Sequence, residues 1–198
     1  MESQAEYWNI DPAAGQVLQA IIHVKKPKKI LEVGTSNGYS AILMGKVASL
    51  YGGHITTIEF FGERFELAKK NIAEANLSET IEVLQGDAVE IMERFPLLTK
   101  EGLGEVSDTQ LTPSNSPFVR GREPLFDFIF LDANKQEYTL YFKAAMKIIN
   151  PHGIIVADNT VSHAKKISAF FQAVSEEPRA QALELSIGTG LMIISTTK

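Results

Sequence analysis

The chain has 198 residues, 44% of them hydrophobic, which favours one folded domain spanning residues 1–198. It contains no cysteine, which excludes disulfides, thiolate nucleophiles and Cys-ligated zinc, and its net charge of −5 argues against an extended phosphate-binding surface. No apolar run reaches the roughly 18 residues of a membrane span, and the N-terminus lacks the pattern of a signal peptide. We therefore expect a cytoplasmic protein with no membrane contact.

Helical and strand patterns alternate along the chain. Apolar residues at helical spacing predict a first helix from Asp11 to Val24, with Asp11 as its cap and Pro12 in its first turn. Later patterns predict strands at 30–33, 54–59, 81–84, 126–131 and 154–157, helices at 39–50, 63–76, 88–95, 138–149 and 164–174, and a turn at 151–153. Two closing strands, at about 183–187 and 191–195, are joined too closely for a crossover and must be antiparallel. This alternation predicts an α/β fold with a mostly parallel sheet.

One segment interrupts the alternation. Residues 97–124 are rich in Gly, Pro, Ser and Thr and carry no helix or strand pattern. A loop of this length is unusual inside a compact domain. We interpret it as a flexible surface insertion, with a lid or a partner contact as the alternative.

The first strand runs into a glycine turn and then a helix. Residues 31–40 read L-E-V-G-T-S-N-G-Y-S, so Gly34 and Gly38 bracket a turn that offers backbone N–H groups to a ligand. The spacing departs from the G-x-G-x-x-G pattern of dinucleotide sites. Glu32 also places a carboxylate two residues before the first glycine, which disfavours phosphate and suits a ligand with a cationic group.

Two other strand ends carry candidate ligand contacts. Glu59 ends the second strand, where doubly wound folds hold ribose hydroxyls. Gly86, Asp87 and Ala88 follow the third strand, and we expect them to lie over an adenine. An isolated Glu at a strand end is otherwise a solvated surface residue.

Oxygen-bearing side chains follow the fourth and fifth strands. Asp132 comes directly after the fourth strand, and Asp158 and Asn159 come after the fifth. These neighbouring strands should end at one edge of the sheet, so the three side chains form a hard-oxygen site for Mg²⁺, with Ca²⁺ or Mn²⁺ as alternatives. Ordinary turn formation is the competing interpretation. Lys135, three residues beyond Asp132, is a candidate base, because a neighbouring cation disfavours its ammonium form.

Taken together, these motifs resemble the cation-dependent class I O-methyltransferases, which include the catechol and caffeoyl-coenzyme A O-methyltransferases. The matching stretches are L-E-V-G-T-S-N-G-Y-S at 31–40, I-E at 58–59, L-D-A-N-K at 131–135 and A-D-N at 157–159. The resemblance covers the chain from about Asp11 to its end. It implies a Rossmann-like methyltransferase fold, with helices on both faces of a seven-stranded sheet whose last strand is antiparallel.

The resemblance also implies the roles of the site residues. It makes Lys135 the catalytic base and assigns a divalent cation to Asp132, Asp158 and Asn159. Together with the strand ends described above, it predicts that S-adenosylmethionine is held by Glu32, Gly34, Thr35, Ser36, Gly38, Ser40, Glu59, Gly86, Asp87, Ala88 and Asp132. The implied activity is methyl transfer to a hydroxyl of a small catechol-like or phenolic acceptor.

The chain departs from the family pattern on the acceptor side. Asn134 and Thr189 stand where relatives often carry Asp, and the segment after Asn159 is short, with His163 close enough in sequence to line an acceptor pocket. One alternative acceptor is a hydroxylated uridine in transfer RNA, gripped by lysines at 25–29 and 165–166 and by Arg120 and Arg122. A non-catalytic module that binds S-adenosylmethionine is another alternative. Relatives are often dimers, so a homodimer is an alternative to a monomer.

Overall fold

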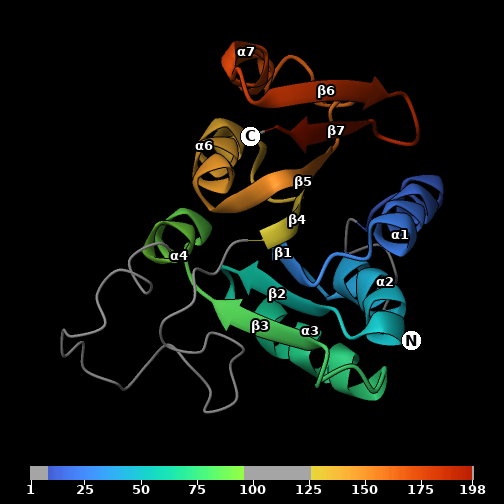
Figure 1. The fold of residues 1–198 in the computed structure, drawn as a ribbon. Coiled ribbons are helices and arrows are strands. Elements are labelled where there is room, and N and C mark those ends of the chain that lie inside the picture. The colour runs from blue at the N-terminus through green and yellow to red at the C-terminus, as the bar shows by residue number, and fades with distance from the viewer. Residues whose placement is uncertain (1–8, 96–125, 198) are drawn as a thin grey trace, which may run out of the picture.

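The computed structural model describes residues 9–95 and 126–197. Its strands are β1 (Lys29–Val33), β2 (His54–Glu59), β3 (Ile81–Gln85), β4 (Phe126–Leu131), β5 (Ile149–Asp158), β6 (Ala180–Leu185) and β7 (Leu191–Thr196). They form one sheet in the order β3-β2-β1-β4-β5-β7-β6 (Figure 1). Neighbours from β3 to β5 are parallel, whereas β7 runs antiparallel to both β5 and β6. The predicted seven-stranded sheet with an antiparallel last strand is confirmed.

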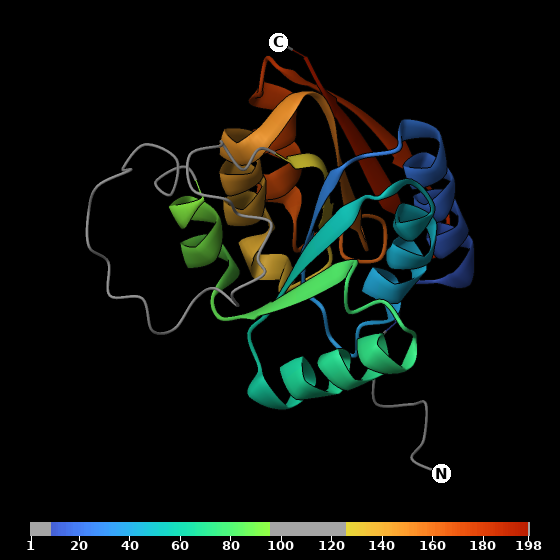
Figure 2. The ribbon, with the colours of Figure 1, turned by 60° about the horizontal axis from the view of Figure 1, so that its bottom comes forward.

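Helices cover both faces of the sheet, as Figures 1 and 2 show. They are α1 (Pro12–Lys25), α2 (Tyr39–Ala48), α3 (Gly62–Glu74), α4 (Ala88–Arg94), α6 (Tyr138–Ile148) and α7 (Ser168–Glu176), with short 3₁₀ turns η1 (Ser49–Tyr51) and η2 (Lys135–Glu137). The predicted cap of α1 is confirmed, because the Asp11 carboxylate accepts the backbone N–H of Ala13 at 2.9 Å. In the described part of the chain, no helix is long and apolar enough to cross a bilayer.

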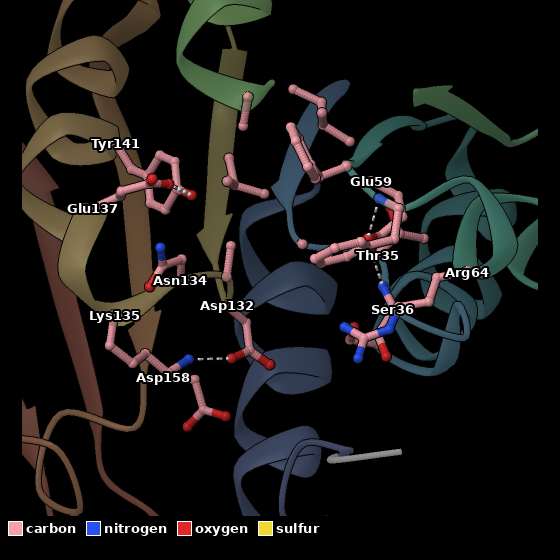
Figure 3. Close-up of a pocket in the computed structure, with 18 of the residues that line it drawn as sticks. Thr35, Ser36, Glu59, Arg64, Asp132, Asn134, Lys135, Glu137, Tyr141 and Asp158 are labelled. Carbon is pink, nitrogen blue, oxygen red and sulfur yellow. Dashed lines mark hydrogen bonds and ion pairs between the residues drawn. The ribbon is translucent and has the colours of Figure 1, made fainter. Parts of the chain in front are cut away.

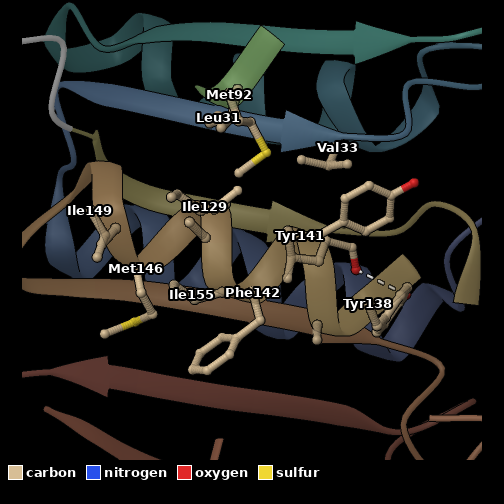
Figure 4. Packing of buried hydrophobic residues seen from close by; sticks show 14 of the residues in the cluster. Leu31, Val33, Met92, Ile129, Tyr138, Tyr141, Phe142, Met146, Ile149 and Ile155 are labelled. Carbon is tan, nitrogen blue, oxygen red and sulfur yellow. Dashed lines mark hydrogen bonds between the residues drawn. The ribbon is translucent and has the colours of Figure 1, made fainter. Parts of the chain in front are cut away.

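The alternation of side chains along the strands builds two cores. On β1, Leu31 and Val33 point to the face covered by α4, α6 and α7, where they belong to a cluster that includes Met92 and Tyr141 (Figure 4). Ile30 points to the opposite face, where α1, α2 and α3 pack. Because successive residues of a strand face opposite ways, Glu32 shares the face of Ile30. A carboxyl group therefore lies in a strand that is buried on both faces.

Three segment boundaries differ from the prediction by more than two residues. The expected turn at 151–153 is a bulge inside β5, which pairs with β4 both at Ile149 and again from Ile154. Helix α7 begins at Ser168 rather than 164, because residues 164–167 form turns whose backbone N–H groups are bonded locally to Val161 and His163. Strand β6 covers 180–185 rather than 183–187. The predicted insertion at 97–124 lies outside the described residues.

The order of the strands creates a switch point between β1 and β4. The chain adds β2 and β3 on one side of β1 and then returns to place β4 on the other side. In open α/β sheets, ligands bind outside the carboxyl ends of the strands at this point. The glycine turn after β1 and the acidic residue after β4 both lie there, which sets the position of the candidate site.

Candidate active site

A cavity of about 660 Å³ lies at the carboxyl edge of the sheet, around the switch point (Figure 3). Most of the predicted site residues line it: Gly34, Thr35, Ser36, Ser40, Glu59, Gly86, Asp87, Ala88, Asp132, Lys135, Asp158 and Asn159. Two predicted contacts, Glu32 and Gly38, do not line the cavity. The structure therefore brings together residues that are more than 120 positions apart in the sequence. It leaves Glu32, two residues before the glycine turn, buried and outside the cavity lining.

The glycine turn packs directly against the end of β4. Gly34 has φ +97°, and a Cβ atom added there would lie 2.3 Å from the carbonyl oxygen of Asp132. Gly38, with φ +85°, is the N-cap of α2. Both positions use the left-handed region that glycine adopts without steric cost. The glycine turn can therefore pack against the end of β4 and border the cavity.

Glu59 is held between the glycine turn and the loop after β2. Its Oε2 accepts the backbone N–H of Ser36 at 2.7 Å, and its Oε1 accepts that of Phe61 at 3.0 Å. A carboxylate has about four lone-pair positions, so each oxygen keeps room for another donor. The group is thus fixed in place and able to accept hydroxyl hydrogens of a ligand in the cavity.

Glu32 is fully buried, and its surroundings favour the protonated form. Thr57 donates a hydrogen bond to Oε2 at 2.6 Å, and the hydroxyl of Thr35 lies 2.6 Å from that of Thr57. Oε1 has no hydrogen-bond partner among the described residues. Burial raises the pKa of Glu32 to about 8, while hydrogen bonds from Ser40 and Thr57 oppose the shift. Thr35 and Ser40, which line the cavity, separate this carboxyl group from it.

The end of β4 carries an ion pair. Lys135 Nζ lies 2.8 Å from Asp132 Oδ1, and each side chain is 17% exposed. The same Nζ donates to the Tyr138 hydroxyl at 2.9 Å, and that hydroxyl lies 3.2 Å from the carbonyl oxygen of Leu131 and 3.0 Å from that of Asp158. Tyr138 therefore joins the lysine to the ends of both β4 and β5.

Asp158 and Asn159 lie beside this pair, as predicted. The register aligns Leu131 with Ala157, so Asp132 and Asp158 each follow a paired position on adjacent strands. Burial, reinforced by the negative charge of Asp132, raises the pKa of Asp158 to about 6. Among the described residues there is no group of three or more His, Cys, Asp or Glu that could hold a metal. The predicted cation-binding set is not such a group, because it consists of the carboxylates of Asp132 and Asp158 and the side-chain amide of Asn159.

Sequence reasoning missed several residues of the cavity. Tyr141 donates to Glu137 Oε2, and both line the cavity near Asn134 (Figure 3). Phe60, Phe61 and Arg64 also line it, with the Arg64 guanidinium 5.2 Å from the centre of the Phe61 ring. Thr189 and His163, which the sequence had already placed on the acceptor side, line it as well. The i,i+4 spacing of Glu137 and Tyr141 was a usable signal, since such residues meet on one helical face.

The lysines proposed to grip RNA fall into two groups. Lys25 donates to the carbonyl of His152 at 2.7 Å, and Lys28 donates to that of Tyr51 at 2.5 Å. Residues 25–29 precede β1 or begin it, whereas the cavity follows β1, so the strand separates them by roughly 16 Å. Lys165 and Lys166 come shortly after the cavity-lining His163. Arg120 and Arg122 lie outside the described residues.

Comparison with known proteins gives consistent matches. A family model described as O-methyltransferase matches residues 2–107 and 105–196. A catechol O-methyltransferase from Niastella koreensis is 33% identical over 157 residues, which cover 79% of this chain and 60% of that protein. A caffeoyl-CoA O-methyltransferase from Populus kitakamiensis is 25% identical over 197 residues, which cover 90% of this chain and 74% of that protein. The crystal structure of an O-methyltransferase from Bacillus cereus in complex with SAH has a TM-score of 0.78 at 27% identity, covering 96% of this chain and 83% of that one.

The architecture is that of the Rossmann-like fold of S-adenosylmethionine-dependent methyltransferases. Within that class, the chain belongs to the O-methyltransferase family. It spans about three fifths of the length of its Niastella relative.

Proposed function

We propose that the protein is an S-adenosylmethionine-dependent, divalent-cation-dependent O-methyltransferase that acts on a hydroxyl of a small catechol-like or phenolic acceptor. The observation that carries the proposal is the convergence of Glu59, the Lys135–Asp132 ion pair and the buried Asp158 around one cavity. Family membership supports the reaction class. The catechol and caffeoyl-CoA relatives, named for catechol-type acceptors, support the acceptor class.

The charge of the cavity suits the methyl donor. Acidic side chains outnumber basic ones among the lining residues: Glu59, Asp87, Asp132, Glu137 and Asp158 against Arg64 and Lys135. S-adenosylmethionine carries a sulfonium and an ammonium, so an acidic cavity favours it by simple electrostatics. Glu59 would accept the ribose hydroxyls, and Gly86 to Ala88 would lie over the adenine. Glu32 lies behind Thr35 and Ser40, so we assign it an indirect role in holding the ammonium.

The residues at the ends of β4 and β5 also fit a divalent cation. Asp132 and Asp158 repel one another enough to contribute to the raised pKa of Asp158, and a bound cation would relieve that repulsion. Two carboxylates with an amide oxygen match the ligand preference of Mg²⁺, Ca²⁺ or Mn²⁺. When bound, the cation would act as a Lewis acid that favours the ionised hydroxyl and orients a vicinal diol. Ionising a phenol with a pKa near 10 at pH 7 costs about 4 kcal/mol, so this contribution matters.

Lys135 is placed to take the acceptor's proton. An ammonium has three N–H donors, and those of Lys135 serve Asp132 and Tyr138, which leaves a third position on the nitrogen. The neutral amine would keep both hydrogen bonds and direct its lone pair along that third position. The acceptor oxygen then attacks the sulfonium methyl carbon as the carbon–sulfur bond breaks, and S-adenosylhomocysteine leaves with its electron pair. Fixing both reactants in line supplies much of the remaining acceleration.

A radiolabel transfer assay tests this proposal. Purified protein is incubated with methyl-labelled S-adenosylmethionine and catechols, caffeoyl thioesters or hydroxyuridine-containing RNA, with Mg²⁺ or with EDTA. We expect transfer to a catechol that EDTA abolishes, while calorimetry still detects binding of S-adenosylmethionine. Full turnover in EDTA would refute the role of the metal, and an enzyme that methylates only the RNA would refute the acceptor. The RNA alternative also predicts affinity that falls steeply with salt.

A further inference from the structure

The turn between β6 and β7 is bonded directly to a carboxylate at the cavity. Its central residue, Thr189, lines the cavity and donates a hydrogen bond to Asp158.

Hydrogen bonds fasten this turn to the segment that follows β5. The carbonyl oxygen of Thr189 accepts the backbone N–H groups of Val161 and Ser162 at 3.1 and 2.9 Å, and that of Gly190 accepts the N–H of Thr160 at 3.1 Å. A Cβ atom added to Gly190, which has φ +96°, would lie 2.4 Å from the backbone nitrogen of Val161. The backbone of the turn is therefore held in close contact with the loop, which fixes the position of the Thr189 side chain.

The Thr189 hydroxyl acts on one oxygen of Asp158. It donates to Oδ1 at 2.9 Å, and the backbone N–H of Asn159 donates to the same oxygen at 2.7 Å. Oδ1 thus has both of its lone-pair positions occupied. Among the described residues, the hydrogen bonds to this carboxylate both go to Oδ1 and none goes to Oδ2, and Asp158 as a whole residue is 1% exposed. The Asp158 carboxylate is therefore held by Oδ1, and Oδ2 is left available to bind a ligand.

We infer that Thr189 is a positioning residue that holds Asp158 as a single-oxygen ligand of the divalent cation, with Oδ2 as the ligating atom. This inference rests on the proposed function, since it concerns the same site. The hydroxyl occupies Oδ1 without adding a third negative charge beside Asp132 and Asp158. A carboxylate at position 189 would instead add to their repulsion. Outer-shell hydrogen bonds of this kind typically change metal affinity by about 10- to 100-fold.

The experiment measures Mn²⁺ binding to the full chain by electron paramagnetic resonance, without S-adenosylmethionine or acceptor. Thr189→Val keeps the shape of the side chain and removes the hydroxyl, and we expect the Kd for Mn²⁺ to rise about tenfold or more. Thr189→Ser restores a donor and should return the Kd to within about threefold of wild type. Thr160→Val is the matched control: Thr160 lies in the same fastened loop, but its buried hydroxyl has no hydrogen-bond partner among the described residues, so the Kd should not change.

The outcomes separate the inference from the proposed function. A Thr189→Val protein that binds Mn²⁺ within twofold of wild type overturns the positioning role and leaves the metal site intact. An equal loss in Thr160→Val also overturns it, because the effect would then come from packing of the loop. Wild-type protein that binds no Mn²⁺ overturns the metal site and the inference together. Unchanged affinity of Thr189→Val for S-adenosylmethionine, measured by calorimetry, confirms that the variant is folded.

Discussion

The buried carboxyl group of Glu32 makes the stability of the fold depend on pH. Its pKa is about 8 in the folded protein against 4.5 for an unperturbed glutamate, because burial disfavours the charged form. The folded chain keeps this proton between those two values, whereas the unfolded chain releases it. Stability from this group is therefore fully present below pH 4.5 and is lost as pH rises, until the folded pKa is passed.

Replacement of Glu32 with glutamine removes this linkage. From pH 5 to pH 8 the two pKa values correspond to a loss of about 3 to 4 kcal/mol in the wild-type free energy of unfolding, and Glu32→Gln should not show it. The glutamine side chain has nearly the same shape, and its oxygen can still accept from Thr57. Between pH 5 and pH 8, the free energy of unfolding of Glu32→Gln should therefore rise by about 3 to 4 kcal/mol relative to that of the wild type.

Urea denaturation at pH 5, 6, 7 and 8, without ligands, measures the effect. With a urea dependence of about 2 kcal/mol per molar, the difference between the two midpoints should change by roughly 1.5–2 M over this range. Glu63→Gln is the control, because it removes a carboxylate from an exposed position and should keep the wild-type pH dependence. Parallel curves for wild type and Glu32→Gln would show that Glu32 is already ionised in the folded state, which would refute the reasoning.

Two further predictions follow from the geometry. Gly34→Ala should cost at least about 2 kcal/mol of stability by chemical denaturation, because its φ is positive and its Cβ would meet the Asp132 carbonyl. Gly52→Ala, also at positive φ but with no atom of another residue nearer than 3.9 Å, should cost only about 1 kcal/mol, and equal losses would contradict the role of the close contact. Tyr138→Phe should lower kcat about tenfold with little change in the Kd of S-adenosylmethionine, since it frees Lys135. A wild-type kcat would refute the positioning of Lys135 by this tyrosine.

The sequence predicted the strand ends well because the relevant signals are local. The apolar run at 126–131, followed directly by Asp132, predicts both a buried strand and the polar group at its end. Parallel strands end at the same edge of a sheet, so the meeting of Asp132 with Asp158 followed from order alone. The segment boundaries at 151–153 and 164–168 were wrong because a bulge in a strand and irregular turns before a helix leave no periodic signal.

Local sequence by itself determined the alternation of strands and helices, the glycine turn and the polar residues at the strand ends, because each depends on residues adjacent in the chain. Only the tertiary structure decided what surrounds them. It placed Glu32 behind Thr35 and Ser40, where the loss of solvent favours its proton. It also placed the Thr189 hydroxyl on Asp158, 31 residues away. Burial and hydrogen bonding depend on neighbours that the fold brings together, so the protonation and orientation of these carboxyl groups are properties of the packed molecule.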